Sequence, residues 1–277
     1  MLIRNIKVSV LVVNFNKAKY IKRCLESLIN QTFKNFEVIF FDDQSNDNSI
    51  YEAKKFEKRL NIKIIKNNKR KSKYGAYNQM NSYLKAFYHS KGEILLFLDS
   101  DDFFKKNKIL KIVKFFLDKD NKKKEILFDL PYIFFSEKKI KLFEIKNRFL
   151  KKSWPRFSPQ SCISIKRSYF FNILKNITFK KFPNIDLDFR IAVYSYFVSK
   201  NFMFFKHYLT FYFQDPDGRA SKYKFFSKNW WERRLEAFLF LNYILKKNKL
   251  LTIKSFDYFI TINIVRLLSL YENKKII

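Results

Sequence analysis

Three carboxylates stand within four residues, in Asp99-Ser100-Asp101-Asp102, directly after the apolar run 94–98. Like charges repel, so a fold that gathers them needs a compensating cation, and hard oxygen ligands suit Mg²⁺ or Mn²⁺. Such a cation bridges diphosphate oxygens and neutralises the charge that builds on a departing nucleotide. The alternative is a solvated acidic turn before a helix near Asn107. The position after a buried strand favours the metal.

A second acidic segment, Asp42-Asp43-Gln-Ser-Asn-Asp47-Asn-Ser49, also follows an apolar run. A carboxylate at a strand end accepts hydrogen bonds from a base or a ribose. The alternative is the N-cap of the next helix, which Asp47 or Ser49 provides. Both interpretations hold together, because Asp43 is not needed for the cap.

Two further acidic residues, Asp186 and Asp188, open a helix in the second half of the chain. Transfer of a group to a hydroxyl needs one general base, and either carboxylate is a candidate. The alternative is acidic charge that complements the helix dipole. In the segment 214–221, Arg219 follows Gly218 and could reach a diphosphate. An ordinary surface turn explains that segment equally well.

Other chemistries find little support in the residues. The two histidines, His89 and His207, are far apart in sequence, which disfavours a zinc site and a Ser-His-Asp triad. No glycine-rich phosphate loop is present, so neither a P-loop nor a dinucleotide fingerprint is expected. Cys24 and Cys162 form no disulfide framework, which fits a reducing, cytoplasmic compartment.

The elements that must position these residues alternate along the first hundred positions. Apolar runs without polar alternation indicate strands buried on both faces, and strand–helix alternation indicates a parallel sheet. Ligands bind such sheets at the carboxyl ends of the strands, where both acidic segments fall. The predicted strands are 8–13, 37–41, 62–65, 94–98, 125–130, 132–135, 161–165 and 203–213. The predicted helices are 20–29, 76–90 and 187–196, with a helical pattern from residue 230 onward.

The formal net charge of the 277 residues is +32. Three explanations of this charge compete. They are nucleic-acid binding, attraction to an anionic membrane, and a codon bias towards Lys, Asn, Ile, Phe and Tyr. The lysines are spread along the whole chain, which favours codon bias first and membrane contact second. After residue 230, Lys246, Lys254 and Arg266 interleave with large apolar residues, as in a helix that lies on a membrane. The alternative is helices that pack on the catalytic domain.

Four ordered motifs together resemble glycosyltransferase family 2. They are Asn14-Phe-Asn16, Cys24-Leu-Glu-Ser-Leu-Ile-Asn-Gln-Thr-Phe33, Asp42-Asp43-Gln-Ser-Asn-Asp47 and Phe97-Leu-Asp-Ser-Asp-Asp102. The resemblance covers about residues 7–117. It implies a GT-A fold, in which a Rossmann-like mixed sheet is flanked by helices, and inverting transfer from a nucleotide-sugar.

The resemblance also implies roles for single residues. Asp43 matches the position that contacts the base, Asp101 the ribose-side aspartate and Asp102 the metal ligand, while many members share Asp99. The nucleotide-sugar site also takes in Val13, Asn14 and Lys73, together with Arg219. Ile185 stands where many members have a glutamate. Asp188 is preferred to Asp186 as the base, because an arginine two positions later resembles some members.

The sequence therefore predicts a GT-A domain over 1–227 and a helical, basic and aromatic region over 228–277. The predicted function is transfer of a sugar, with a divalent metal, to a glycan or a lipid-linked acceptor in the synthesis of bacterial surface polysaccharide. We expect a cytoplasmic protein, peripheral on the inner face of the membrane, and no nucleic-acid partner. The alternatives are a non-catalytic relative that binds nucleotide-sugars and a basic nucleic-acid-binding protein.

Overall fold

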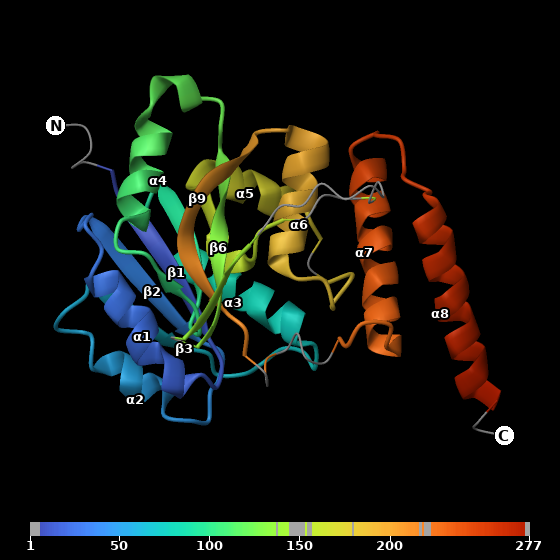
Figure 1. Cartoon of the computed structure of the whole chain (residues 1–277), viewed down its shortest axis with the longest axis horizontal. Coiled ribbons are helices and arrows are strands. Elements are labelled where there is room, and N and C mark those ends of the chain that lie inside the picture. The colour runs from blue at the N-terminus through green and yellow to red at the C-terminus, as the bar shows by residue number, and fades with distance from the viewer. Residues whose placement is uncertain are drawn as a thin grey trace.

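The computed structural model describes residues 6–136, 138–143, 153, 157–178, 180–215, 218 and 223–274. Within these residues a single mixed sheet forms the centre of the molecule, with the strand order β3-β2-β1-β4-β8-β6-β9-β5 and with β7 paired to β6. Helices cover both faces of the sheet, and the last two helices lie at one end (Figure 1). The predicted mixed sheet flanked by helices is confirmed.

The first four strands are parallel, as predicted: β1 (Val8–Asn14), β2 (Phe36–Asp42), β3 (Ile62–Lys66) and β4 (Ile94–Asp99). In the centre of this group, Asn14 on β1 lies opposite Asp42 on β2, and Val13 lies opposite Asp99 on β4. The carboxyl ends of the three strands are therefore level. This register brings both acidic segments to one edge of the sheet.

The other strands make the sheet mixed. They are β5 (Phe103–Phe104), β6 (Ile126–Ser136), β7 (Lys139–Leu142), β8 (Ile163–Lys166) and β9 (Phe202–Phe213). β8 runs antiparallel to β4 and β6, whereas β6 and β9 run parallel. The prediction of two strands on either side of Pro131 is wrong, because β6 continues through it. Its pairing with β9 shifts register at Pro131, which has no N–H to donate to a ladder.

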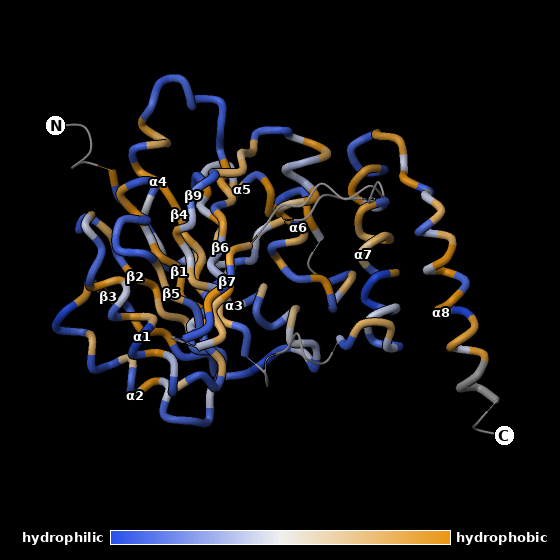
Figure 2. The backbone as a smooth tube through the Cα atoms, viewed as in Figure 1, coloured by the Kyte–Doolittle hydropathy of each residue, from blue (hydrophilic) through white to orange (hydrophobic). Residues whose placement is uncertain are grey.

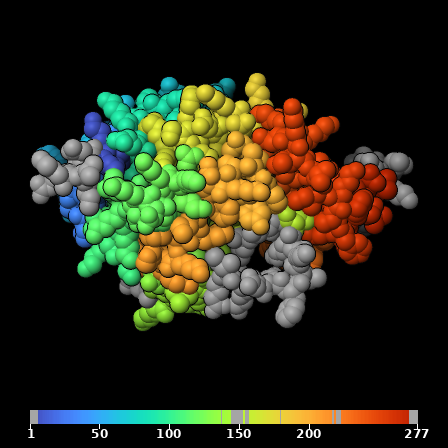
Figure 3. All heavy atoms as spheres, turned by 90° about the horizontal axis from the view of Figure 1, so that it is seen from above, coloured from blue at the N-terminus to red at the C-terminus, as the bar shows by residue number. Residues whose placement is uncertain are grey.

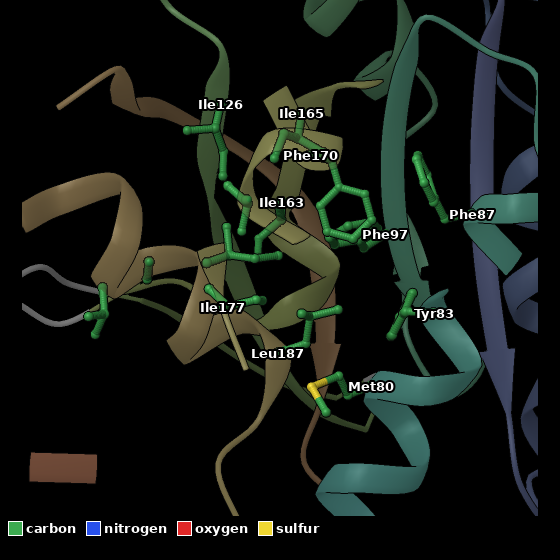
Figure 4. Close-up of a cluster of buried hydrophobic side chains, with 14 of the residues drawn as sticks. Met80, Tyr83, Phe87, Phe97, Ile126, Ile163, Ile165, Phe170, Ile177 and Leu187 are labelled. Carbon is green, nitrogen blue, oxygen red and sulfur yellow. The ribbon is translucent and has the colours of Figure 1, made fainter. Parts of the chain in front are cut away.

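Two apolar cores lie on opposite faces of the sheet. On β1, Val8, Val10 and Val12 point into one core, and Leu11 and Val13 point into the other, which explains the absence of polar alternation. The first core is covered by α1 (Ala18–Ile29), α2 (Ser49–Lys54) and α4 (Lys108–Leu117). The second core is covered by α3 (Gly75–His89), α5 (Arg167–Asn176) and α6 (Leu187–Val193), which continues as a π-helix over Tyr194–Ser199. Figure 4 shows aromatic and aliphatic side chains of this second core meeting between the sheet and α3.

The C-terminal helices are α7 (Lys228–Lys247) and α8 (Phe256–Lys274). Phe240, Leu241 and Ile244 of α7 belong to the same core as α3, α5 and α6. α8 packs on α7 and forms the outer end of the molecule (Figures 1 and 3). The predicted boundary after residue 227 stays a prediction, and α7 is integral to the main core. Along the described residues, every helix is too short or too polar to cross a bilayer.

Candidate active site

Asn14, at the end of the central strand β1, ties the two acidic segments together. Its amide donates to Asp42 Oδ1 (2.7 Å) and to Ser45 Oγ (3.1 Å), and its Oδ1 accepts from Ser100 Oγ (2.7 Å). Only 1% of Asn14 is exposed. All of these bonds join strand-end loops, so the side chain fixes the distance between the loop after β2 and the loop after β4. The Asn14 side chain is thus buried between the two loops, and its predicted place in the nucleotide site stays a prediction.

Asp43 lies in a small polar setting at the end of β2. Its carboxylate accepts from Asn67 Nδ2 (2.8 Å) and pairs with Arg70 Nε (3.2 Å), and the Arg70 guanidinium lies 3.5 Å from the centre of the Phe15 ring. Burial raises the pKa of Asp43, and the Asn67 hydrogen bond and the Arg70 charge oppose that rise. A flat ring, a planar cation and a carboxylate together suit a heterocyclic base. A neighbouring cleft is lined by Gln44, Ser45, Asn46, Lys66, Asn67 and Asn68.

Two other residues predicted for the nucleotide site, Lys73 and Val13, have different surroundings from Asp43. Lys73 is exposed, with its Nζ 5.4 Å from the centre of the Tyr74 ring, and Arg70 is the cation that contacts Asp43. Val13 is buried in the core, and its carbonyl accepts from the Ser100 N–H (3.1 Å). Arg219 lies outside the described residues. The sequence held little signal for Phe15, Asn67 and Arg70, because Phe15 lies in the loop after β1 and the other two lie in the loop after β3.

Asp99, at the end of β4, points towards α3. It accepts hydrogen bonds from Gln79 Nε2 and from the Tyr83 hydroxyl, each at 2.8 Å. Its backbone N–H donates to Ser161 Oγ (2.9 Å). Two neutral donors from one helix therefore hold this carboxylate at the edge of the loop.

Asp101 points the other way, towards the loop after β1. It forms an ion pair with Lys17 (3.0 Å), and the Lys17 ammonium also contacts Asp215, beyond the end of β9. Burial lowers the pKa of Lys17, but Asp101 and Asp215 raise it overall. The Asp101 carbonyl accepts from Arg23 Nη2 (2.8 Å). Sequence reasoning missed Lys17 and Asp215, which lie 198 positions apart and meet only in the fold.

Asp102 is buried, with 1% of its surface exposed. Its Oδ2 accepts from Ser161 Oγ (2.5 Å), and its Oδ1 accepts from the Phe213 N–H (2.7 Å). Burial, and then the charges of Asp101 and Asp99, raise the pKa of Asp102 well above its ordinary value. The three carboxylates thus point in different directions. Among the described residues, no group of three or more His, Cys, Asp or Glu side chains is arranged to hold a metal ion.

The two candidate bases occupy different environments at the start of α6. Asp186 is buried at the N-cap position and pairs with Arg233 of α7. Asp188, in the first turn, is half-buried, and its Oδ1 accepts from the Phe189 N–H (2.6 Å). Arg190, on which the preference for Asp188 rested, is fully buried and donates to the carbonyl oxygens of Ile185, Thr178, Lys181 and Phe182. It shapes the loop before α6.

The phenol of Tyr212, on β9, has a raised pKa to which carboxylates from both the acidic loop and α6 contribute. Burial raises the pKa of the Tyr212 phenol, followed by the negative charges of Asp102, Asp99, Asp188 and Asp101 in that order. The charges of the loop after β4 and of Asp188 therefore act on the same phenol.

Comparison with known proteins gives a consistent family. Residues 9–178 match the model of Glycosyl transferase family 2. An uncharacterized glycosyltransferase of Nostoc sp. is 32% identical over 117 residues, which is 41% of this chain and 34% of the relative. The poly(ribitol-phosphate) beta-N-acetylglucosaminyltransferase TarS of Staphylococcus aureus is 35% identical over 114 residues, or 40% of this chain and 19% of TarS. The chain thus spans about a third or less of the length of these two relatives.

Two solved structures share the fold. TarS 1–349 in complex with UDP-GlcNAc aligns with a TM-score of 0.59 at 17% identity, over 87% of this chain and 72% of TarS 1–349. The mannosyltransferase PcManGT from Pyrobaculum calidifontis, in complex with GDP-Man and Mn²⁺, aligns with a TM-score of 0.55 at 14% identity, over 84% and 63% of the two chains. The fold is therefore the GT-A fold of these enzymes. With the family match extending over more than half of its residues, this chain belongs to Glycosyl transferase family 2.

Proposed function

We propose that this chain transfers a sugar from a nucleotide-diphosphate sugar to an acceptor hydroxyl, with inversion at the anomeric carbon. The observation that carries the proposal is the meeting of the two acidic segments, which contain Asp43 and Asp101, at one edge of the sheet in a chain of this family. The complexes of TarS with UDP-GlcNAc and of PcManGT with GDP-Man support a nucleotide-sugar as the donor.

The donor base binds at Asp43. The Phe15 ring, 38% exposed, offers a stacking surface, and Arg70 lies against it. The Asp43 carboxylate accepts a hydrogen bond from a base N–H or a ribose hydroxyl once its pairing with Arg70 loosens. Asn14 keeps this subsite at a fixed distance from Asp101, which faces the ribose and the diphosphate.

A divalent cation, Mg²⁺ or Mn²⁺, fits beside Asp101, because such ions are commonly held by one or two carboxylates plus substrate phosphates. Asp101 faces the Lys17 ammonium on the open side of the loop, whereas Asp99 is turned towards α3. For Asp102, which the sequence predicted as a metal ligand, we propose a different role. Both of its oxygens accept hydrogen bonds in a buried setting, so we assign it to holding the loop. When bound, the cation neutralises charge on the leaving diphosphate.

Asp188 is the general base in this proposal. Asp186 is buried and pairs with Arg233, whereas Asp188 is half-buried in the first turn of α6. The acceptor hydroxyl attacks the anomeric carbon opposite the diphosphate, and its proton passes to the Asp188 carboxylate. The bond from the anomeric carbon to the diphosphate oxygen breaks, and the electron pair leaves with the diphosphate. One carboxylate is enough, unlike in a glycosidase, which uses two.

The acceptor in this proposal is a surface glycan or a lipid-linked precursor, which the polymer named for TarS supports. Leu251, Phe256 and Leu267 are 94%, 80% and 65% exposed at the outer end formed by α7 and α8. Lys254 and Arg266 lie among them, and Figure 2 shows polar and apolar residues alternating along α8. Each basic residue near an anionic surface adds about 1 kcal/mol of attraction. We propose that this end rests on the inner face of the membrane.

Calorimetric titration of UDP and GDP, with and without Mn²⁺, tests the donor site. We expect binding that strengthens with Mn²⁺, and Asp101→Asn should remove that increase. Equal affinities in both conditions would count against the metal. For the membrane, vesicle flotation compares the full chain with a chain that ends at Lys254, which lacks α8 and keeps the core helix α7. The proposal fails if the full chain stays unbound on anionic vesicles at low salt, or if both chains float equally.

A further inference from the structure

A single buried hydroxyl holds both ends of the Asp99–Asp102 loop. Ser161 lies in the 3₁₀ turn Gln160–Cys162 before β8, with no exposed surface. Its Oγ donates to Asp102 Oδ2 (2.5 Å) and accepts from the Asp99 N–H (2.9 Å). A serine hydroxyl has one proton to donate and two lone pairs, so both bonds form at once. The first and last residues of the loop are thereby tied to one atom.

Ser161 is itself fixed from below by a buried ion pair. Lys108 Nζ donates to the Ser161 carbonyl and to Thr210 Oγ1, each at 2.7 Å, and pairs with Asp129 Oδ2 at 2.7 Å. Thr210 Oγ1 donates to Asp129 Oδ1 (2.7 Å). Neither charged side chain has exposed surface. A buried polar network whose groups are hydrogen-bonded to one another is rigid, so it fixes the position of Ser161.

These residues come from distant parts of the chain. Lys108 begins α4, Asp129 is on β6 and Thr210 is on β9, which also supplies the Phe213 N–H to Asp102. The network therefore sets the position of the acidic loop relative to three other elements. Asp101, which lies between the two residues held by Ser161, faces Lys17 on the open side.

We propose that Ser161 is a positioning residue for donor binding, with Lys108, Asp129 and Thr210 fixing it in turn. This inference rests on the proposed function, because the loop it positions is the loop that meets the diphosphate. Ser161 touches neither the nucleotide nor the sugar in this account. It acts by holding Asp101 where the diphosphate and its cation need a carboxylate. Small displacements of such groups matter, since a shift of about 1 Å can lower the rate of a reaction on the order of 10²-fold.

The test is Ser161→Ala with Ser164→Ala as its matched control. Ser164 is the same residue type, is equally buried and lies three positions away on β8, and its hydroxyl has no hydrogen-bond partner among the described residues. Calorimetry on the full chain measures UDP and GDP binding with Mn²⁺. Each variant is measured well below its own melting temperature, so that all of the protein is folded. We expect Ser161→Ala to weaken binding by about 10-fold or more and Ser164→Ala to leave it unchanged.

Thr210→Val takes the place of Ser161→Ala if that variant does not fold. It removes the hydroxyl between Lys108 and Asp129 without touching the acidic loop, and a severalfold loss of affinity is expected. Wild-type binding that is retained in full by the network variant overturns the inference and leaves the proposed function standing. Equal losses in the network variant and the control also overturn it. Failure of the wild type to bind either nucleotide overturns the proposed function, and the inference with it.

Discussion

The buried pair of Lys108 and Asp129 gives a prediction whose size follows from its surroundings. Lys108→Met keeps most of the length of the side chain but removes the only cation that the structure pairs with Asp129 among the described residues. Breaking a buried ion pair by removing one partner costs about 3–5 kcal/mol. For a chain of this size, each kcal/mol lowers the melting temperature by about 2–4 °C, so we expect a fall of roughly 6–20 °C.

The matched double variant separates charge from packing. Lys108→Met with Asp129→Asn removes both charges and keeps an acceptor for the Thr210 hydroxyl. It should recover more than half of the loss, because neutral replacements of a buried pair are often well tolerated. Thermal unfolding followed by circular dichroism measures all four proteins of this cycle. The reasoning is refuted if the single variant melts within a degree or two of the wild type, or if the double variant melts no higher than the single.

The pH dependence of the same variant has a definite sign. Burial raises the pKa of Asp129, and Lys108 opposes that rise. Removing Lys108 raises the pKa of Asp129 further, so the carboxyl stays protonated to a higher pH in the folded state. A group with a raised folded pKa contributes stability below its unfolded pKa and loses it as pH rises through the folded value. The deficit of Lys108→Met should therefore be larger at pH 8 than at pH 5.

The remaining predictions concern the site. Asp188→Asn should lower turnover by on the order of 10²- to 10⁴-fold with little change in donor affinity, because the base faces the acceptor; the same pattern from Asp186→Asn instead would move the base by two positions. Asp43→Asn should weaken nucleotide binding, which calorimetry measures. The melting temperature of Asp43→Asn should also rise relative to that of the wild type between pH 4 and pH 7, because the raised pKa of Asp43 makes the wild type lose stability as the pH increases. Thermal unfolding measures this difference in melting temperature, and a decrease of the difference over the same pH range would contradict the prediction.

The sequence predicted which residues lie at the edge of the sheet, but it did not predict the buried residues that support them. Apolar strands that end on acidic residues predicted that both loops would meet, and the level register of β1, β2 and β4 confirms it. Strand boundaries near Pro131 were wrong, because a missing N–H interrupts a ladder without ending a strand. Arg190 was the reason for preferring Asp188 as the base, but its side chain donates to backbone carbonyls in the interior.

The supporting residues could not be found from local pattern. Ser161, Lys108 and Thr210 meet because β8 lies between β4 and β6, and β9 pairs with β6, an arrangement that no short motif encodes. Arg70 and Phe15 likewise meet through the packing of two loops. Acidic residues at strand ends can be recognised from the sequence alone, whereas contacts between distant loops depend on the order in which the strands pair.

The most direct test of the central claim is mass spectrometry of donor turnover. A panel of UDP- and GDP-sugars is incubated with the full chain and Mn²⁺, and the wild type is compared with Asp188→Asn. We predict that the wild type consumes at least one donor and releases the matching nucleoside diphosphate, and that Asp188→Asn does so far more slowly. Turnover of no donor in the panel, or equal turnover by the two proteins, would contradict the account.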